Sequence, residues 1–413
     1  MNSFQKKTII FLAVVAIAIV GIVFYLKPSK VPQPVQNNSS SSVPFTLEPH
    51  VLTAAGTAFS LSIPKGFNIA TAATGLNRVR FMAKSPDGRL FVTDMKDLSD
   101  NSEGKIYILD HFNTATKKFE SRTTYLSGLR NPNSVAFYTD PIGVNWLYVA
   151  LTDQLVRYRF TLGEIVPTSA PEVLATFPAY GLSYKYGGWH LTRTVKVHND
   201  KVYVSVGSSC DSCEEKTEEP MRASIIQMDA NGSNQQIIAS GLRNAVGLYF
   251  KGDQLYVSAM GADKLGDDKP EEALYLIKPG TNYGWPYCYQ YQSKIYTNNT
   301  QAWDHPIDCS AVPSAAAAFP AHAAPLGLAF FGASAALELA NSFLLSLHGS
   351  STVSLAHGYK IVHIDQQGTV TDFVTGFLHN GTCYARPVDI LPDSDSSFFF
   401  TDDFGGNLYY VYK

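Results

Sequence analysis

The sequence predicts an all-β protein, and specifically a six-bladed β-propeller. Three observations support this: a strand–turn–strand pattern recurs six times, its turns are rich in Asp, Asn and Gly, and aromatic residues are abundant. The chain of 413 residues contains 23 Tyr and 24 Phe, which favour strands over helices. Past residue 60, no stretch with a helical period competes with this interpretation.

The six repeats begin near residues 79, 135, 195, 246, 326 and 388. Each starts with two strand-like runs joined by a hairpin turn, as in VRFMAKSPDGRLFVTDM, and a third run such as KIYILD follows. The turn sequences SPDG, HND, KGD and PDSDS are typical of hairpins. The intervals of roughly 50 to 80 residues leave room for three or four strands in each blade.

The two ends of the propeller are expected to close the ring together. The last repeat stops after its third strand, NLYYVYK, whereas residues 58–69 form an extra strand pattern before the first repeat. That segment would supply the outermost strand of the last blade. Residues 287–325, between the fourth and fifth repeats, form an insertion, which is either a flap over one face or a surface loop.

Composition divides the chain into an N-terminal membrane anchor or signal segment (1–27), a disordered Pro/Ser linker (28–57) and the propeller (58–413). The apolar run at residues 9–26 is just long enough to cross a bilayer, and Lys6 and Lys7 before it favour a cytoplasmic N-terminus with an exported body. Because a clear small-residue cleavage site is missing, we favour an uncleaved anchor over a cleaved signal peptide. The expected location is periplasmic or extracellular, with the protein anchored in the membrane.

All five cysteines lie in the part that would be exported, and an oxidising compartment favours disulfides. Cys288 with Cys309 would close the insertion, and Cys210 with Cys213 could form a tight local bridge. A metal site would need a second Cys/His pair at matching spacing, which the sequence lacks. Cys383 is left over, either buried or free.

Polar residues stand just before or at the first strand of each repeat, and in a propeller these positions converge on one mouth of the central channel. Cations gathered there would attract an anionic ligand, although each arginine could instead pair with a nearby carboxylate. The net charge of −3 gives no reason to expect a nucleic-acid partner. The residues in question are Arg80, Arg130, Asn131, His190, Arg193, Arg243, Asn244, His322 and Arg386.

Two features of the sequence could carry chemistry, namely His190 and an acidic stretch. A lone histidine such as His190 is more often structural, but arginines beside it would lower its pKa and leave a neutral imidazole that can accept a proton. The acidic stretch GADKLGDDKPEE at residues 261–272 could hold a hard cation through carboxylates and carbonyls, or it could be a solvated loop.

The segment SGLRNAVGLYF at residues 240–250, followed by LYVSAMGAD and EEALYLIKPGTNYGWP, resembles the hallmark segment of the soluble pyrroloquinoline-quinone (PQQ)-dependent sugar dehydrogenases. GGWHLTRTVKVHNDKVYVSVGSSCDSC, PAHAAPLGLAF, LLSLHGS and ARPVDILPD are similar to further parts of these enzymes, in order, so the resemblance covers about residues 60–413. It implies oxidation of an aldose or related sugar, with PQQ and Ca²⁺ as cofactors. The electron acceptor would be a membrane quinone or a small carrier.

The resemblance also implies roles for single residues. His190 would be the general base that takes the proton of the anomeric hydroxyl while the C1 hydride passes to the quinone. The backbone carbonyls of Gly261 and Ala262 would hold calcium, which polarises a quinone carbonyl. The expected contacts to the cofactor are Arg193, Arg243, Asn244, His348 and Arg386.

The sequence departs from this family at two places. His348 stands where glucose-oxidising members place a lysine. The residues after His348-Gly349-Ser350 are Ser351, Thr352 and Val353, where sorbosone-type members continue with Trp-Asn-Arg.

Two other classes of function are open alternatives. A calcium-dependent sugar lactonase on a similar propeller would need several carboxylates that converge in the channel, whereas the residues before the repeats are mostly Arg, Asn and His. A non-catalytic binding propeller would explain the fold and the anchor, but not the expected convergence of His190, Arg243, Asn244 and Arg386 at one mouth. We therefore expect an enzyme.

Overall fold

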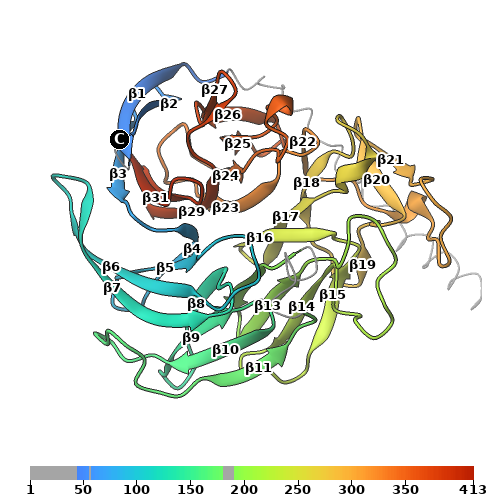
Figure 1. The fold of residues 1–413 in the computed structure, drawn as a ribbon, viewed down its shortest axis with the longest axis horizontal. Helices are drawn as coiled ribbons and strands as arrows, with labels where there is room; N and C mark the ends of the chain where they lie inside the picture. The colour runs from blue at the N-terminus through green and yellow to red at the C-terminus, as the bar shows by residue number, and fades with distance from the viewer. Residues whose placement is uncertain (1–43, 55–56, 180–189) are drawn as a thin grey trace, which may run out of the picture. The chain divides into compact units, whose positions relative to one another are not determined.

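The computed structural model describes residues 44–54, 57–179 and 190–413 of the chain. Six sheets follow one another along the sequence, and the all-β, six-bladed propeller is confirmed. Their inner strands are β4 (Arg78–Lys84), β8 (Ser134–Thr139), β12 (Arg193–His198), β16 (Asn244–Lys251), β23 (Pro325–Phe331) and β29 (Pro387–Ser394). Each inner strand contacts the inner strand of the next blade, and β29 contacts β4, so the ring is closed. Figure 1 shows β4, β16, β23 and β29 meeting near its centre.

The outer strands pair antiparallel in sequence order away from each inner strand. They are β5 (Leu90–Met95), β6 (Gly104–Asn113) and β7 (Lys118–Leu129) in blade one; β9 (Asn145–Ala150), β10 (Gln154–Arg159) and β11 (Glu172–Thr176) in blade two; β13 (Lys201–Val206), β14 (Ser224–Asp229) and β15 (Gln236–Ser240) in blade three; β17 (Gln254–Met260), β18 (Glu272–Leu276) and β22 (Ala317–Phe319) in blade four; β24 (Ser342–Leu347), β25 (Lys360–Ile364) and β26 (Val370–Val374) in blade five; and β30 (Ser397–Asp402), β31 (Asn407–Tyr412) and β3 (Asn68–Ala73) in blade six.

The ring closes by pairing the two ends of the propeller, as expected, but with a different strand. β3 pairs antiparallel with β31, so the closing strand is Asn68–Ala73 and the prediction of residues 58–69 is wrong in its bounds. Residues before it instead form a hairpin of β1 (Leu47–Ala54) and β2 (Thr57–Pro64). The predicted disordered linker therefore does not extend to residue 57, because β1 occupies its last part.

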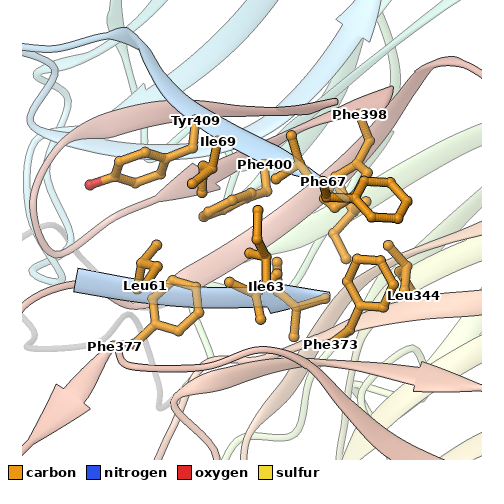
Figure 2. Close-up of a cluster of buried hydrophobic side chains, with 14 of the residues drawn as sticks. Leu61, Ile63, Phe67, Ile69, Leu344, Phe373, Phe377, Phe398, Phe400 and Tyr409 are labelled. Atoms are coloured by element: carbon orange, nitrogen blue, oxygen red, sulfur yellow. The ribbon is translucent and has the colours of Figure 1, made fainter. Parts of the chain in front are cut away.

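The hairpin is held by a hydrophobic core between blades five and six. Figure 2 shows Leu61 and Ile63 of β2 among aromatic side chains that include Phe373 and Phe400. Both β2 side chains are fully buried, and burial of such a side chain stabilises a fold by about 1.5–3 kcal/mol. The apolar alternation in SLSIP therefore packs the β1–β2 hairpin against the propeller.

The expected N-terminal anchor at residues 1–27 and most of the linker lie outside the described residues. Within the described ranges, no helix has the length and apolar character needed to span a bilayer.

The insertion between blades four and five is shorter than predicted, because β22 is the fourth strand of blade four and starts at residue 317. It contains the strand pair β20 (Cys288–Tyr291) and β21 (Lys294–Thr297), which Figure 1 shows on the outer side of β18, beside the blade. Both expected disulfides, Cys210–Cys213 and Cys288–Cys309, are present, and Cys383 is free and half-buried. The remaining short elements are β19 (Thr281–Asn282), β27 (Leu378–His379), β28 (Thr382–Cys383) and the single turns η2 (Asp263–Leu265), η3 (Cys309–Ala311) and η4 (Val353–Leu355).

A buried hydroxyl on the second strand ties three of the blades to the next blade. Thr401 of β30 accepts the N–H of Asp389 in its own blade at 3.0 Å and donates to the carbonyl of Arg80 in blade one at 2.7 Å. The N–H of Asp389 is available because β29 is bulged opposite the hydroxyl, and β4 and β16 are bulged at the matching position. The same pair of bonds is made by Thr93 between Phe81 and Asn133, and by Ser258 between Gly247 and Leu326.

Blade five has the same bulge, and Ser346 is the residue opposite it. Its hydroxyl is fully buried and has no hydrogen-bond partner within the described part of the chain. Ser346 is therefore a matched site at which the same kind of side chain makes no inter-blade bond.

Thr401→Val keeps the shape of the side chain but leaves a buried N–H and a buried carbonyl without partners. We expect the free energy of unfolding to fall by about 2–4 kcal/mol, measured by urea titration. The control Ser346→Ala should change it by less than about 1 kcal/mol, because no bond is lost. Equal losses in the two variants would contradict a stabilising role for the inter-blade hydroxyl.

Candidate active site

His190 lies three residues before β12, next to residues 180–189, which are outside the described ranges. Its Nδ1 is 2.9 Å from the carbonyl oxygen of Ser208. Because a carbonyl only accepts, Nδ1 carries the proton and Nε2 keeps its lone pair. Burial, and then the positive charge of Arg243, hold the pKa of His190 well below its ordinary value. The ring is therefore neutral near pH 7 and can accept a proton at Nε2.

Asn244, the first residue of β16, lies on the other side of Gly207 from His190. A Cβ atom on Gly207 would be 2.5 Å from Cβ of His190 and 2.7 Å from Oδ1 of Asn244, so only glycine allows this approach. The Oδ1 atom is buried and accepts no hydrogen bond from any described residue, while Nδ2 contacts the sulfur of Met260 at 3.4 Å. A buried acceptor without a donor costs about 1–3 kcal/mol, which a bound polar ligand could offset.

Arg243 is buried, and four hydrogen bonds hold its guanidinium. It donates to the carboxylates of Asp211 at 2.8 Å and Asp263 at 2.9 Å, and to the carbonyl of Gly261 at 2.6 Å. The alternative in which an arginine pairs with local carboxylates therefore holds for Arg243. Its contacts join a loop of blade three to the Gly261 loop of blade four.

The Gly261 loop is rich in carbonyl and carboxylate oxygens, which are the ligands that calcium requires. Ala262 directly precedes the turn η2, and Asp263 in that turn is half-exposed and also lies 3.6 Å from His322. The N–H of Gly261 donates to Glu272, whose pKa burial raises to about 8. The carbonyl of Gly261 retains one lone pair beside the one that Arg243 occupies.

Side chains offer no competing metal site in the described ranges. The only converging group of three His, Cys, Asp or Glu residues there is Cys210, Cys213 and Glu215, and the disulfide between the two cysteines removes their thiolates. The convergent carboxylates that a lactonase-type calcium site needs are absent from the described residues.

A second charged cluster joins residues that follow the second strands of blades five and six to the first strand of blade one. Nε2 of His348 is 2.7 Å from Asp403, which also accepts from Arg80 at 2.7 Å and faces Arg78 at 3.3 Å. Burial, opposed by Asp403, lowers the pKa of His348 to about 4. Burial alone would raise the pKa of Asp403, but His348 and the two arginines hold it below its ordinary range.

Arg386 covers this cluster with a guanidinium that has no carboxylate partner among the described residues. It donates to the carbonyls of His348, at 3.1 Å, of Gly349, and of Ser350, at 3.0 Å. Its guanidinium carbon also lies 5.1 Å from the ring centroid of Tyr359. Among the described contacts, this positive charge meets only carbonyl dipoles and an aromatic ring, which leaves it able to attract an anion.

Arg193 contacts the backbone that carries His190. It is fully buried and donates to the carbonyls of His190 at 2.7 Å, Thr192 at 3.0 Å and Pro178 at 3.0 Å. Burial lowers its pKa to about 9. These contacts assign Arg193 to holding the backbone that carries His190.

The remaining predicted residues are held in protein contacts. Arg130 pairs with Asp100 and Asp153, and Nε2 of His322 lies 2.8 Å from the carbonyl oxygen of Gly266 in the acidic loop. Asn131 is buried and bonds to the backbone of Ser99 and Asn101.

The site thus has two parts, one around His190 and one around His348. Asn133 connects them, because its amide accepts from Arg80 at 3.1 Å and donates to Thr194 at 3.1 Å. Sequence reasoning missed Asn133, Asp211 and Asp403. Asp403 directly follows the second strand of blade six, as His348 directly follows the second strand of blade five, and this shared position is a signal that could have found it.

A family model described as TrAA12-like matches residues 61–413, and the chain belongs to this family. The family expected from the GLRN…NYGWP segment is thereby confirmed. An uncharacterized protein of Borreliella burgdorferi is 28% identical over 370 residues, which is 86% of this chain and 91% of that protein.

Solved structures share the fold. The holo form of the PQQ domain of pyranose dehydrogenase from Coprinopsis cinerea is 17% identical, with a TM-score of 0.65 over 88% of this chain and 100% of that chain. A calcium structure of a Trichoderma reesei Carbohydrate-Active Enzymes Family AA12 protein has 16% identity and a TM-score of 0.67, covering 90% and 99%. The PQQ-bound aldose sugar dehydrogenase from Streptomyces coelicolor has 18% identity and a TM-score of 0.58, covering 85% and 99%.

The depressed pKa of His348 gives a prediction for solution NMR. The imidazole should stay neutral as the pH falls from 7 and take up its proton near pH 4. Below about pH 6.5 the unfolded chain binds a proton that the folded His348 does not, so this group's contribution to stability falls as the pH drops toward 4. Protonation of His348 near pH 6.5 would contradict the dominance of burial over the pairing with Asp403.

Proposed function

We propose that this protein is a quinoprotein oxidoreductase that oxidises an aldose or related sugar, with PQQ and Ca²⁺ as cofactors. The observation that carries the proposal is the fixed tautomer of His190, whose Nδ1 proton is held by Ser208 and whose neutral Nε2 is available as a base. Membership of the TrAA12-like family and the likeness to PQQ-containing sugar dehydrogenases support the same chemistry.

The residues around the mouth suit a planar cofactor that carries carboxylates. Arg386 offers a guanidinium without a carboxylate partner in the described structure, and Asn244 offers a buried amide oxygen without a donor. His348 would contact the cofactor beside Arg386. It stands where glucose-oxidising members place a lysine, and the residues after it replace the Trp-Asn-Arg of sorbosone-type members. In this proposal Arg243 contacts the cofactor only with the edge that its carboxylate partners leave accessible.

Calcium would be held by the backbone carbonyls of Gly261 and Ala262. Asp263 would help to balance the charge of the ion, because its side chain is 55% exposed and lies next to this loop. The calcium structure of the Trichoderma reesei protein supports a calcium-binding member of this fold.

In the proposed reaction, His190 takes the proton of the sugar hydroxyl at Nε2. The Nδ1–H bond to the Ser208 carbonyl then stabilises the imidazolium, while burial and then Arg243 keep the ring neutral before the reaction. The quinone cofactor, when bound, accepts the hydride from the carbon that bears this hydroxyl, so that the hydroxyl becomes a carbonyl. Arg193 keeps His190 in place through its backbone carbonyl.

The same proposal covers partners and location. Electrons would leave to a membrane quinone or a small carrier. The two disulfides support an exported, oxidising location, either periplasmic or extracellular. A membrane anchor at residues 1–27 is part of this proposal.

Reconstitution tests the function directly. PQQ and Ca²⁺ are added to the purified apo-protein, and dye reduction is followed with a panel of aldoses. We expect micromolar or tighter PQQ binding and turnover of at least one sugar. His190→Gln should lower kcat by about 10²- to 10⁴-fold with PQQ affinity nearly unchanged, because only the proton acceptor is lost.

The control is His111→Gln, which removes an exposed histidine on the β6–β7 hairpin and should leave kcat unchanged. Failure of the wild-type protein to bind PQQ at micromolar concentration would rule out the cofactor. Full activity of His190→Gln would rule out the base. Lactone hydrolysis without PQQ would support the lactonase alternative instead.

A further inference from the structure

The loop between β13 and β14 links the two proposed functions of the mouth, proton transfer and cofactor binding. At its start, Ser208 accepts from Nδ1 of His190 at 2.9 Å and donates its N–H to the carbonyl of Arg243 at 2.7 Å. Its hydroxyl donates to the carbonyl of Cys210 at 2.7 Å. A movement of this loop would therefore change the base and the arginine together.

Asp211, three residues further on, is buried and accepts five hydrogen bonds. Its carboxylate accepts from Arg243 at 2.8 Å and from the N–H groups of Asp263 at 2.7 Å and Lys264 at 3.2 Å. Its backbone carbonyl accepts from Nε of Arg243 at 3.0 Å and from the indole of Trp285 at 2.9 Å. One residue thus fixes both the arginine and the turn that follows the carbonyls proposed to bind calcium.

The disulfide between Cys210 and Cys213 closes a short ring that contains Asp211. A ring with a sequence separation of 3 restricts the unfolded chain less than the ring of 21 closed by Cys288 and Cys309. Its main effect is therefore local, on the backbone from which Asp211 reaches Arg243. Both cysteines are partly exposed, whereas the side chain that they orient is buried.

We propose that Asp211, oriented by the Cys210–Cys213 ring, is a positioning residue that sets Arg243 and the Gly261–Asp263 loop relative to His190. The inference rests on the proposed function for its consequence, which is that an intact ring is needed for tight binding of PQQ and Ca²⁺. It assigns a functional role to a disulfide whose loop-closure effect is smaller than that of Cys288–Cys309. Without the ring, Arg243 loses its more buried carboxylate, and the Gly261 carbonyl loses its fixed place.

The first arm of the test uses the apo-protein and needs no cofactor. The double variant Cys210→Ser/Cys213→Ser and the single variant Asp211→Asn are compared with the wild type by NMR. The reporter is the indole N–H of Trp285, assigned through Trp285→Phe. We expect this resonance to shift in both variants, and the amides of Asp263 and Lys264 to exchange at least tenfold faster.

The second arm measures PQQ affinity in the presence of Ca²⁺ and the thermal midpoint of unfolding. Both variants should bind PQQ at least tenfold more weakly with a small change in midpoint. The matched control Cys288→Ser/Cys309→Ser removes the other disulfide, so it should lower the midpoint more and leave the affinity unchanged.

The outcomes separate the two proposals. An unchanged Trp285 indole in Cys210→Ser/Cys213→Ser overturns the positioning role, and so does unchanged PQQ affinity despite a shifted indole. An equal loss of affinity in the Cys288→Ser/Cys309→Ser control also overturns it, because the effect would then be general destabilisation. If the wild-type protein binds no PQQ, the proposed function fails, and the apo-protein arm alone decides whether Asp211 positions Arg243.

Discussion

The pairing of β3 with β31 holds the propeller closed, and the part of the site around His348 depends on that closure. It joins the two ends of the propeller and brings Arg80 of blade one within 2.7 Å of Asp403 of blade six, across 323 positions of sequence. With the ring closed, the inner strands start at one mouth, and the residues before them can act together. The buried hydroxyl of Thr401 then fixes blade six against blade one at the same seam.

The mouth carries less unpaired positive charge than its number of arginines indicates. Arg80, Arg130 and Arg243 are each neutralised by carboxylates, and Arg193 is buried among carbonyls. Arg386 is the cation whose described contacts are carbonyl dipoles and an aromatic ring. Burial, and then the charge of Arg243, keep His190 neutral, whereas Arg386 is the arginine best suited to receive an anionic group.

The sequence was sufficient for those features that depend on local pattern. Alternating apolar residues and Asp/Gly turns predicted the six blades, and the compartment argument predicted both disulfides. The β1–β2 hairpin was missed because the preceding Pro/Ser-rich composition masked where the linker ends, and β22 because its Ala-rich sequence lacks strand character. Glycine at 207 gave no local sign that it separates His190 from Asn244.

The partners of the site residues were the least predictable part. Asp211 meets Arg243 of the next blade across 32 positions, and Asp403 meets Arg80 across 323 positions only after the ring has closed, so no local spacing connects either pair. His190 and Asn244 could be proposed from the resemblance, but their surroundings, a Ser208 carbonyl and an unpartnered amide oxygen, are properties of the fold. The sequence predicted a generally cationic cluster. In the fold, each buried side chain of that cluster has its own partners.

A crystal structure of the protein with PQQ and Ca²⁺ would decide whether the mouth is a quinone site. We expect the cofactor at the mouth, in contact with Asn244 and Arg386, with the ion on the carbonyls of Gly261 and Ala262 and a substrate position next to Nε2 of His190. Density for PQQ elsewhere, such as between the β20–β21 pair and blade four, would contradict this arrangement, as would a cofactor at the mouth that leaves His190 out of reach.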